Sequence, residues 1–185
     1  MRILFSILSC IAILAAAPVQ AGTVPIGTMA TWAANPVQVN GDKTFTYLSD
    51  SGNWNGSEYV YLSSNLALES HSLGMLLGDY TGPKTLGVSY KVDITSPYVF
   101  KSVAVDQDHT GDNVDSYKDV FGSEADWAFY TTPGAGTLAT LHAVNNVVPG
   151  DVPLPQLQTI WIRDTITLDA TGSVLSVSNT YVQAD

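Results

Sequence analysis

The chain has 185 residues, with 17 acidic and 7 basic side chains and a formal net charge of −10 at pH 7. This balance lacks the basic footprint that phosphate binding needs, so nucleic acid and anionic membrane surfaces are not expected partners. The only cysteine is Cys10. Because Cys10 lies in the N-terminal segment described next, we exclude disulfides, thiol catalysis and cysteine-ligated zinc from the remaining chain.

Residues 1–21 have the anatomy of a secretory signal peptide. Arg2 gives a positive start, residues 3–17 form an apolar run, and small residues end the segment at Ala21. Two alternatives are a retained membrane anchor, which needs about 20 apolar residues, and lipidation at Cys10. We expect cleavage after Ala21, no membrane span thereafter, and a single mature domain at residues 22–185 that is secreted, periplasmic or held at the cell surface.

The N-terminal half of this domain contains signals for paired strands. Asn40-Gly41 stands between two alternating runs, residues 37–39 and 44–48, and this pattern predicts a β-hairpin. Asn55-Gly56 precedes a further run and predicts a second turn of the same kind. For residues 66–77 we favour a strand over a short helix, because serine and glycine recur there.

The C-terminal half also reads as strands. Residues 86–94 alternate strictly between apolar and polar side chains, which is typical of a half-buried antiparallel strand. Residues 98–105 are largely apolar on both faces and predict a central strand, and residues 173–183 predict another strand. Residues 114–126 are expected to include a helical turn.

Residues 157–169 form a further long alternating segment. Ile160 and Ile162 share one face, and Asp164 interrupts that face, which indicates a bulge or a partner. Trp161 lies on the opposite face and is expected to pack between sheets. Many short strands without a linker or repeat predict a single all-β domain, an antiparallel β-sandwich, with a small β-barrel as the runner-up.

One cluster of polar residues has the composition of a calcium site. Asp106, Asp108, Thr110 and Asp112 alternate along a segment that also contains Gly111, and Ca²⁺ prefers six to eight oxygen ligands of this kind. The alternative is an ordinary strand-to-loop turn, where the same residue types are favoured. The sequence therefore predicts a candidate calcium loop, with calcium as the only expected cofactor.

Aromatic residues supply the other candidate site. Trp54 lies between two asparagines and Trp127 lies beside Asp126, so we expect both rings to be exposed platforms for a sugar. His71, His109 and His142 lack metal-ligand spacing and are expected on the surface or in loops. No nucleophile-elbow motif is present, so the sequence names no catalytic residue.

The C-terminal strands resemble a known class. Residues 159–167, Gly172 and residues 177–183 resemble the end of bacterial exported proteins of the PEP-CTERM class, where a V-x-D-T strand, a glycine turn and an S-N-T-F-x-Q strand precede the sorting tag. The resemblance implies an exported surface or matrix protein and carries over no functional residues. The printed sequence has no Pro-Glu-Pro tag, so we expect release or loose surface association.

Together these patterns predict an exported domain that acts by binding or as a structural surface component. The sharper version is a calcium-dependent carbohydrate-binding module whose partner is a polysaccharide or matrix component. A secreted hydrolase with an unrecognised active site is the alternative. A flat aromatic strip favours the first, and a deep pocket holding a histidine and a carboxylate favours the second.

Overall fold

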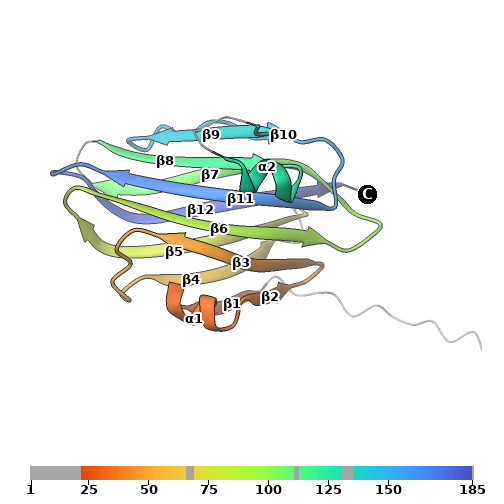
Figure 1. Cartoon of the computed structure of the whole chain (residues 1–185), viewed down its shortest axis with the longest axis horizontal. Helices are drawn as coiled ribbons and strands as arrows, with labels where there is room; N and C mark the ends of the chain where they lie inside the picture. Colours follow the sequence, from red (N-terminus) through yellow and green to blue (C-terminus); the bar gives the residue numbers. More distant parts are fainter. Residues whose placement is uncertain (1–21, 66–68, 111–112, 131–135, 185) are drawn as a thin grey trace, which may run out of the picture.

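The structure, a computed structural model, describes residues 22–65, 69–110, 113–130 and 136–184. The expected signal peptide therefore lies outside the described residues. Within them, two six-stranded antiparallel sheets pack face to face, which confirms the predicted β-sandwich; the sheets do not close into a barrel (Figure 1). Sheet A contains, in spatial order, β1 (Thr23–Gly27), β4 (Tyr59–Asn65), β5 (Ser70–Thr81), β12 (Ser173–Ala184), β7 (Val99–Thr110) and β10 (Val152–Pro153). Sheet B contains β2 (Val37–Asn40), β3 (Lys43–Ser51), β6 (Lys84–Ile94), β11 (Thr159–Leu168), β8 (Val114–Phe121) and β9 (Ala139–Val144).

The inner faces of the two sheets form the core, and β11 shows best how the sequence builds it. Its even-numbered residues are buried and its odd-numbered residues are half-exposed, as a period of two requires. The register of β11 with β6 and β8 is unbroken, so Asp164 marks buried partners and not a bulge. Trp161 lies on the outer face and is half-buried, so the prediction that it packs between the sheets is wrong.

The strand predicted at residues 86–94 is β6, but it alternates only beyond Tyr90. Leu86 to Tyr90 are all buried, because the outward residues in this part, Gly87 and Ser89, are small and lie below their neighbours. A Cβ added to Gly87 would lie 2.5 Å from Ser51 Oγ. Glycine at this position therefore leaves room for the side chain of Ser51 on β3.

Two hairpin predictions have different outcomes. The β2–β3 hairpin is confirmed, but Asn40 pairs with Lys43, so Gly41 (φ +63°) and Asp42 form the turn one residue later than predicted. Asn55-Gly56 does not connect a hairpin, because β3 and β4 belong to different sheets. The predicted strand over residues 66–77 is confirmed by β5 from Ser70 onward, whereas residues 66–68 lie outside the described residues.

Helix α1 (Met29–Ala34) contributes a side chain to the core, whereas helix α2 (Glu124–Ala128) lies on the outer face of one sheet. The sequence did not predict α1, which begins at the N-cap Thr28 and places Trp32, fully buried, against Tyr47 and Tyr90 at one end of the core. The helical turn expected within residues 114–126 is α2, which begins after the N-cap Ser123 and lies on the outer face of sheet B (Figure 1). Most of that expected segment is instead β8.

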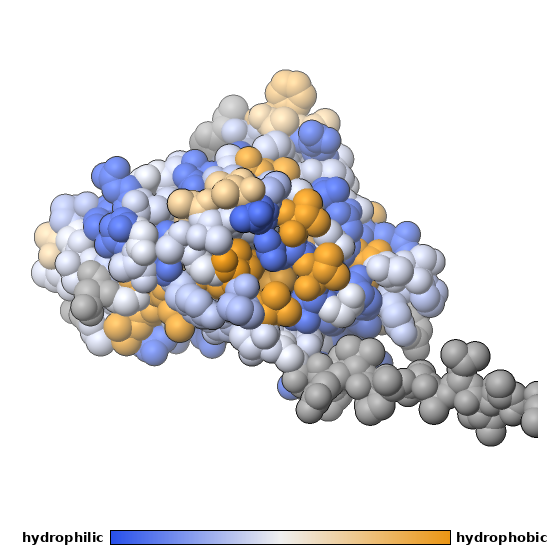
Figure 2. Space-filling model, turned by 90° about the horizontal axis from the view of Figure 1, so that it is seen from below, coloured by the Kyte–Doolittle hydropathy of each residue, from blue (hydrophilic) through white to orange (hydrophobic). Residues whose placement is uncertain are grey.

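The edges of the sandwich are irregular. The predicted central strand at residues 98–105 is β7, which pairs along most of its length with β12 but meets β10 only at Val152–Pro153. The opposite edge strand β2 exposes Val37 and Val39. Figure 2, seen from the side of α1, β1 and β2, shows hydrophobic residues gathered near the middle of this face. Neither α1 nor α2, the helices within the described ranges, is long and apolar enough to cross a membrane.

Candidate functional site

A β-bulge in β3 shapes the outer face of sheet B. Tyr47 pairs with Tyr90, but Ser49 pairs with Ser89, so Leu48 is an extra residue on β3. Directly opposed residues of antiparallel strands point to the same side. Tyr90 points into the core and Ser89 points outward, so the bulge turns Ser49 outward as well.

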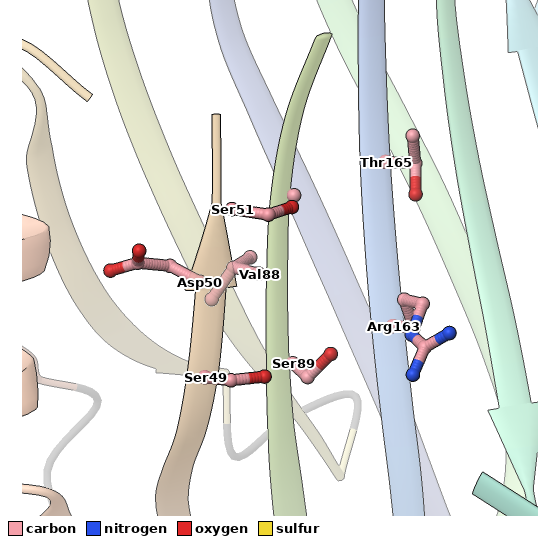
Figure 3. A pocket seen from close by; sticks show the side chains of 8 residues that line it. Ser49, Asp50, Ser51, Val88, Ser89, Arg163 and Thr165 are labelled. Carbon is pink, nitrogen blue, oxygen red and sulfur yellow. The ribbon is translucent and has the colours of Figure 1, made fainter. Parts of the chain in front are cut away.

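The bulge produces two rows of small polar side chains across three strands. Ser49, Ser89 and Arg163 form one row, and Ser51, Gly87 and Thr165 form the next. These small residues leave a depression of about 260 Å³ in the outer face, which we call the Arg163 depression. Figure 3 shows Arg163 and Thr165 on β11 opposite the serines of β3 and β6, with the side chain of Asp50 turned away. The residues that line the depression are Ser49, Asp50, Ser51, Gly87, Val88, Ser89, Arg163 and Thr165.

The Arg163 side chain is supported by two aromatic rings. Its Cζ lies 4.2 Å from the ring centroid of Tyr130 and 5.9 Å from that of Trp127, which are cation–π distances. The ion pairs found within the described residues do not include Arg163. A guanidinium has five N–H donors in a planar fork, so this arrangement leaves a charged donor group at the edge of a hydroxyl-lined depression.

Asp119 fixes the aromatic support. Its Oδ2 accepts a hydrogen bond from Tyr130 Oη at 2.5 Å, and its Oδ1 accepts one from Thr140 Oγ1 at 2.6 Å. Burial and the hydrogen bond to Asp119 raise the pKa of Tyr130, although the charge of Arg163 acts in the opposite direction. Tyr130 therefore stays protonated at neutral pH and keeps its ring beneath the guanidinium.

Further aromatic residues extend this face beyond the depression. Tyr117 on β8 lies in the row of Thr165, and its ring stacks on that of His142 at 3.9 Å with an angle of 12° between the planes. His142 Nε2 lies 3.4 Å from Asp115 Oδ1. Trp161 occupies the row next to Arg163. The outer face of sheet B thus combines aromatic rings, hydroxyl groups and one guanidinium.

The two tryptophans predicted as exposed platforms are both half-buried. Trp54 packs edge-on against Tyr80, and its Nε1 donates at 3.3 Å to the carbonyl oxygen of Gly87, a residue that lines the depression. Trp127 lies on α2 beside Arg163. The structure therefore places both residues next to the Arg163 depression, as supports for its lining and not as open platforms.

The candidate calcium residues lie elsewhere, on the outer face of sheet A. Asp106, Asp108 and Thr110 are exposed and belong to β7, so the expected tight loop is wrong for these residues; Asp112 is outside the described residues. Alternate side chains on a strand stand about 7 Å apart. Within the described ranges, no group of three or more histidine, cysteine, aspartate or glutamate side chains could hold a metal ion. Calcium binding stays a prediction.

The histidines are not all on the surface. His109 is half-exposed and His142 is exposed, but His71 is buried on β5, 3.5 Å from Asp42. Burial and the nearby charge of Lys43 lower the pKa of His71 to about 4, while Asp42 acts in the opposite direction. His71 is therefore neutral at pH 7, and no sequence pattern distinguished it from the other two.

Comparisons with known proteins do not identify a family or a ligand for this chain. Neither a family model nor a curated protein matches the sequence. Among solved structures, the chain is similar to TmCBM61, solved in complex with beta-1,4-galactotriose, with a TM-score of 0.35 and 10% identity over 71% of this chain and 86% of that chain. A likeness at this level supports no inference about the ligand, so function is inferred from the site.

Proposed function

We propose that this chain is an exported, non-catalytic β-sandwich domain that binds a polysaccharide at the Arg163 depression. The observation that carries the proposal is a guanidinium without an ion pair, within the described residues, beside serine and threonine hydroxyls and supported by Tyr130 and Trp127. Hydroxyl groups exchange hydrogen bonds with sugar hydroxyls, and aromatic side chains add apolar contact with one polar end.

The charge of Arg163 favours an acidic sugar. Arginine binds carboxylates through two parallel hydrogen bonds, and such charged pairs are stronger than neutral ones. The chain contains only two arginines, Arg2 and Arg163. The net charge of −10 acts against a polyanion at long range, so it is the local pairing with Arg163 that favours a carboxylate. On this pairing, the proposed ligand is a polysaccharide that contains uronic acid residues.

The alternative, a secreted hydrolase, would need a different kind of site from the Arg163 depression. A deep pocket with a histidine and a carboxylate would favour it. The Arg163 depression is lined by no histidine, and Asp50, its one acidic side chain, turns away and accepts a hydrogen bond from Tyr47 Oη at 2.8 Å (Figure 3). The lining of this depression therefore favours binding over hydrolysis.

The first prediction concerns binding of polysaccharides by the Arg163→Gln variant. On an array of neutral, uronate-containing and sulfated polysaccharides, we expect the wild type to prefer the uronate-containing ones. A hydrogen bond to a charged group contributes about 1.5–3 kcal/mol, so its loss should weaken that binding about ten- to a hundredfold. The measurement is affinity electrophoresis or calorimetry with the polysaccharides that bind on the array.

Lys101→Gln is the matched control, because Lys101 is an exposed cation on β7 of the opposite sheet. Its binding should equal that of the wild type. Equal loss in both variants would indicate general charge attraction and contradict the site. Release of reducing sugar by the wild type would favour a hydrolase, and weaker binding in chelator would support the predicted role of calcium.

A further inference from the structure

A cluster of polar side chains lies between the two sheets, on the inner side of sheet B, whereas the Arg163 depression lies on the outer side. Lys118 on β8 and Asp164 on β11 belong to sheet B, and Asn179 on β12 belongs to sheet A. All three are at most 2% exposed. Lysine and aspartate are almost never fully buried unless they are paired, so the cluster needs a chemical explanation.

One carboxylate contacts both of the other groups. Asp164 Oδ1 lies 3.5 Å from Lys118 Nζ, and Asp164 Oδ2 accepts a hydrogen bond from Asn179 Nδ2 at 2.7 Å. Lys118 Nζ also donates to the hydroxyl oxygen of Tyr181 at 2.9 Å. Asp164 Oδ1 and Asn179 Oδ1 are buried without a hydrogen-bond partner in the described part of the chain. The cluster therefore brings an amine and a carboxamide to the same carboxyl group. It also leaves two buried oxygen atoms without a hydrogen bond in the described part of the chain.

Burial makes proton transfer from the amine to the acid less costly than it is in water. Burial lowers the pKa of Lys118 to about 8, although the charge of Asp164 acts to raise it. Burial raises the pKa of Asp164 above its usual range, although Lys118 and Tyr90 act to lower it. Transfer of one proton from the ammonium to the carboxylate gives a neutral amine, which is the nucleophilic form of lysine.

We propose that Lys118 and Asn179 become joined by an intramolecular isopeptide bond, with Asp164 as the group that transfers the proton. The lone pair of Lys118 Nζ attacks Cγ of Asn179 and forms the new C–N bond. The neutral acid Asp164 gives its proton to Nδ2 and takes a proton from Nζ in return. The bond between Cγ and Nδ2 then breaks and ammonia leaves. The ammonia takes the remaining proton from Asp164 and departs as ammonium, so Asp164 returns to its starting carboxylate; no oxidant or cofactor takes part.

A second buried lysine, Lys43, lacks among the described residues what the proposed reaction needs, a carboxylate that contacts both reaction partners. Lys43 on β3 is fully buried and donates to Oε1 of Gln183 on β12, so it too spans the two sheets. Its neighbouring carboxylate, Asp42, lies 3.2 Å from Lys43 Nζ. The hydrogen bonds of the described residues do not connect Asp42 with Gln183, whereas Asp164 contacts both reaction partners. The geometry therefore selects Lys118 and not Lys43.

The bond would link β8 of sheet B to β12 of sheet A across the core. A domain without cysteine after Ala21 cannot form a disulfide, and this linkage would give it a covalent constraint of another kind. Constraints of this sort act mainly on the unfolded chain, whose freedom they reduce. This inference is independent of the proposed polysaccharide binding.

Mass spectrometry of the purified protein tests the proposal directly. The intact mass should be lower, by the mass of one ammonia, than the mass calculated from the observed N-terminal residue. Trypsin cuts after lysine and arginine, and Lys101, Lys118 and Arg163 are consecutive sites. An acylated Lys118 resists cleavage, so residues 102–163 should stay joined to residues 164–185 as one species.

The variants Asp164→Asn and Lys118→Met should show the intact mass calculated from their sequences, with no loss of ammonia. Trypsin should cut the Asp164→Asn variant after Lys118. The wild-type measurement decides the question alone if either variant fails to fold. A full intact mass with free Lys118 would overturn the proposal. A link from the Lys43 peptide to residues 164–185 would also overturn the assignment to Lys118.

Discussion

Val92→Asp should unfold the domain at room temperature or bring it close to unfolding. Val92 on β6 is fully buried between its register neighbours Phe45 and Ile160, which are also fully buried. The change removes about 1.5–3 kcal/mol of apolar burial and places an unpaired carboxylate in the core. Together these costs are about 4 kcal/mol or more, against a usual total stability of about 5–15 kcal/mol.

Lys91→Asp is the control, because the same new residue is placed one position away on the outer face. Lys91 is half-exposed and pairs with Asp93 at 2.9 Å. A surface pair of this kind contributes about 0–1 kcal/mol, so the change should cost about 1 kcal/mol. Urea titrations of the two variants and the wild type measure both values. A loss for Lys91→Asp as large as that for Val92→Asp would contradict the assigned faces of β6.

The sequence predicted the strands well wherever one face of a strand is buried. Alternation located β6 and β11, and Asp164 was recognised as an exception that indicates either a bulge or a partner. Helix α1 was missed, because six residues give little periodic pattern and its stability comes from the burial of Trp32 and not from its own propensity. Local patterns could not show that β3 and β4 belong to different sheets.

The candidate site was harder to predict, since it depends on register. The extra residue Leu48 turns Ser49 outward, and no composition signal marks a bulge of this kind. Trp127 was selected because it is aromatic and lies beside Asp126, and the structure places it beside Arg163. Arg163 itself was not selected, because its proposed role rests on its lack of an ion pair among the described residues, which only the tertiary structure shows. The contact of Asp164 with Asn179 likewise joins two sheets that are adjacent only in space.

The last prediction concerns Glu58, a buried carboxylate between β3 and β4 that holds three parts of the structure together. Its Oε1 accepts a hydrogen bond from the backbone N–H of Met29, at the first turn of α1, at 2.9 Å. Its Oε2 accepts bonds from the backbone N–H of Gly56 at 2.9 Å and from Tyr80 Oη at 2.7 Å. Glu58→Ala leaves these donors without their acceptor, and each unsatisfied buried donor costs about 1–3 kcal/mol. We expect a loss of about 3 kcal/mol in the free energy of unfolding at pH 7.

The loss should depend on pH in a definite direction. Burial acts to raise the pKa of Glu58, but the hydrogen bonds from Tyr80, Met29 and Gly56 outweigh it, so the pKa lies below its ordinary value of 4.5. A carboxyl group whose pKa falls on folding stabilises the protein fully above its unfolded pKa and loses that contribution as the pH drops through the folded pKa. The difference between the wild type and Glu58→Ala should therefore shrink in acid. Urea titrations at pH 7 and well below pH 4.5 measure it, with Glu124→Ala, an exposed glutamate on α2, as the control that should cost little at either pH. A difference that stays constant or grows in acid would show that the Glu58 charge does not hold α1 and Tyr80 in place.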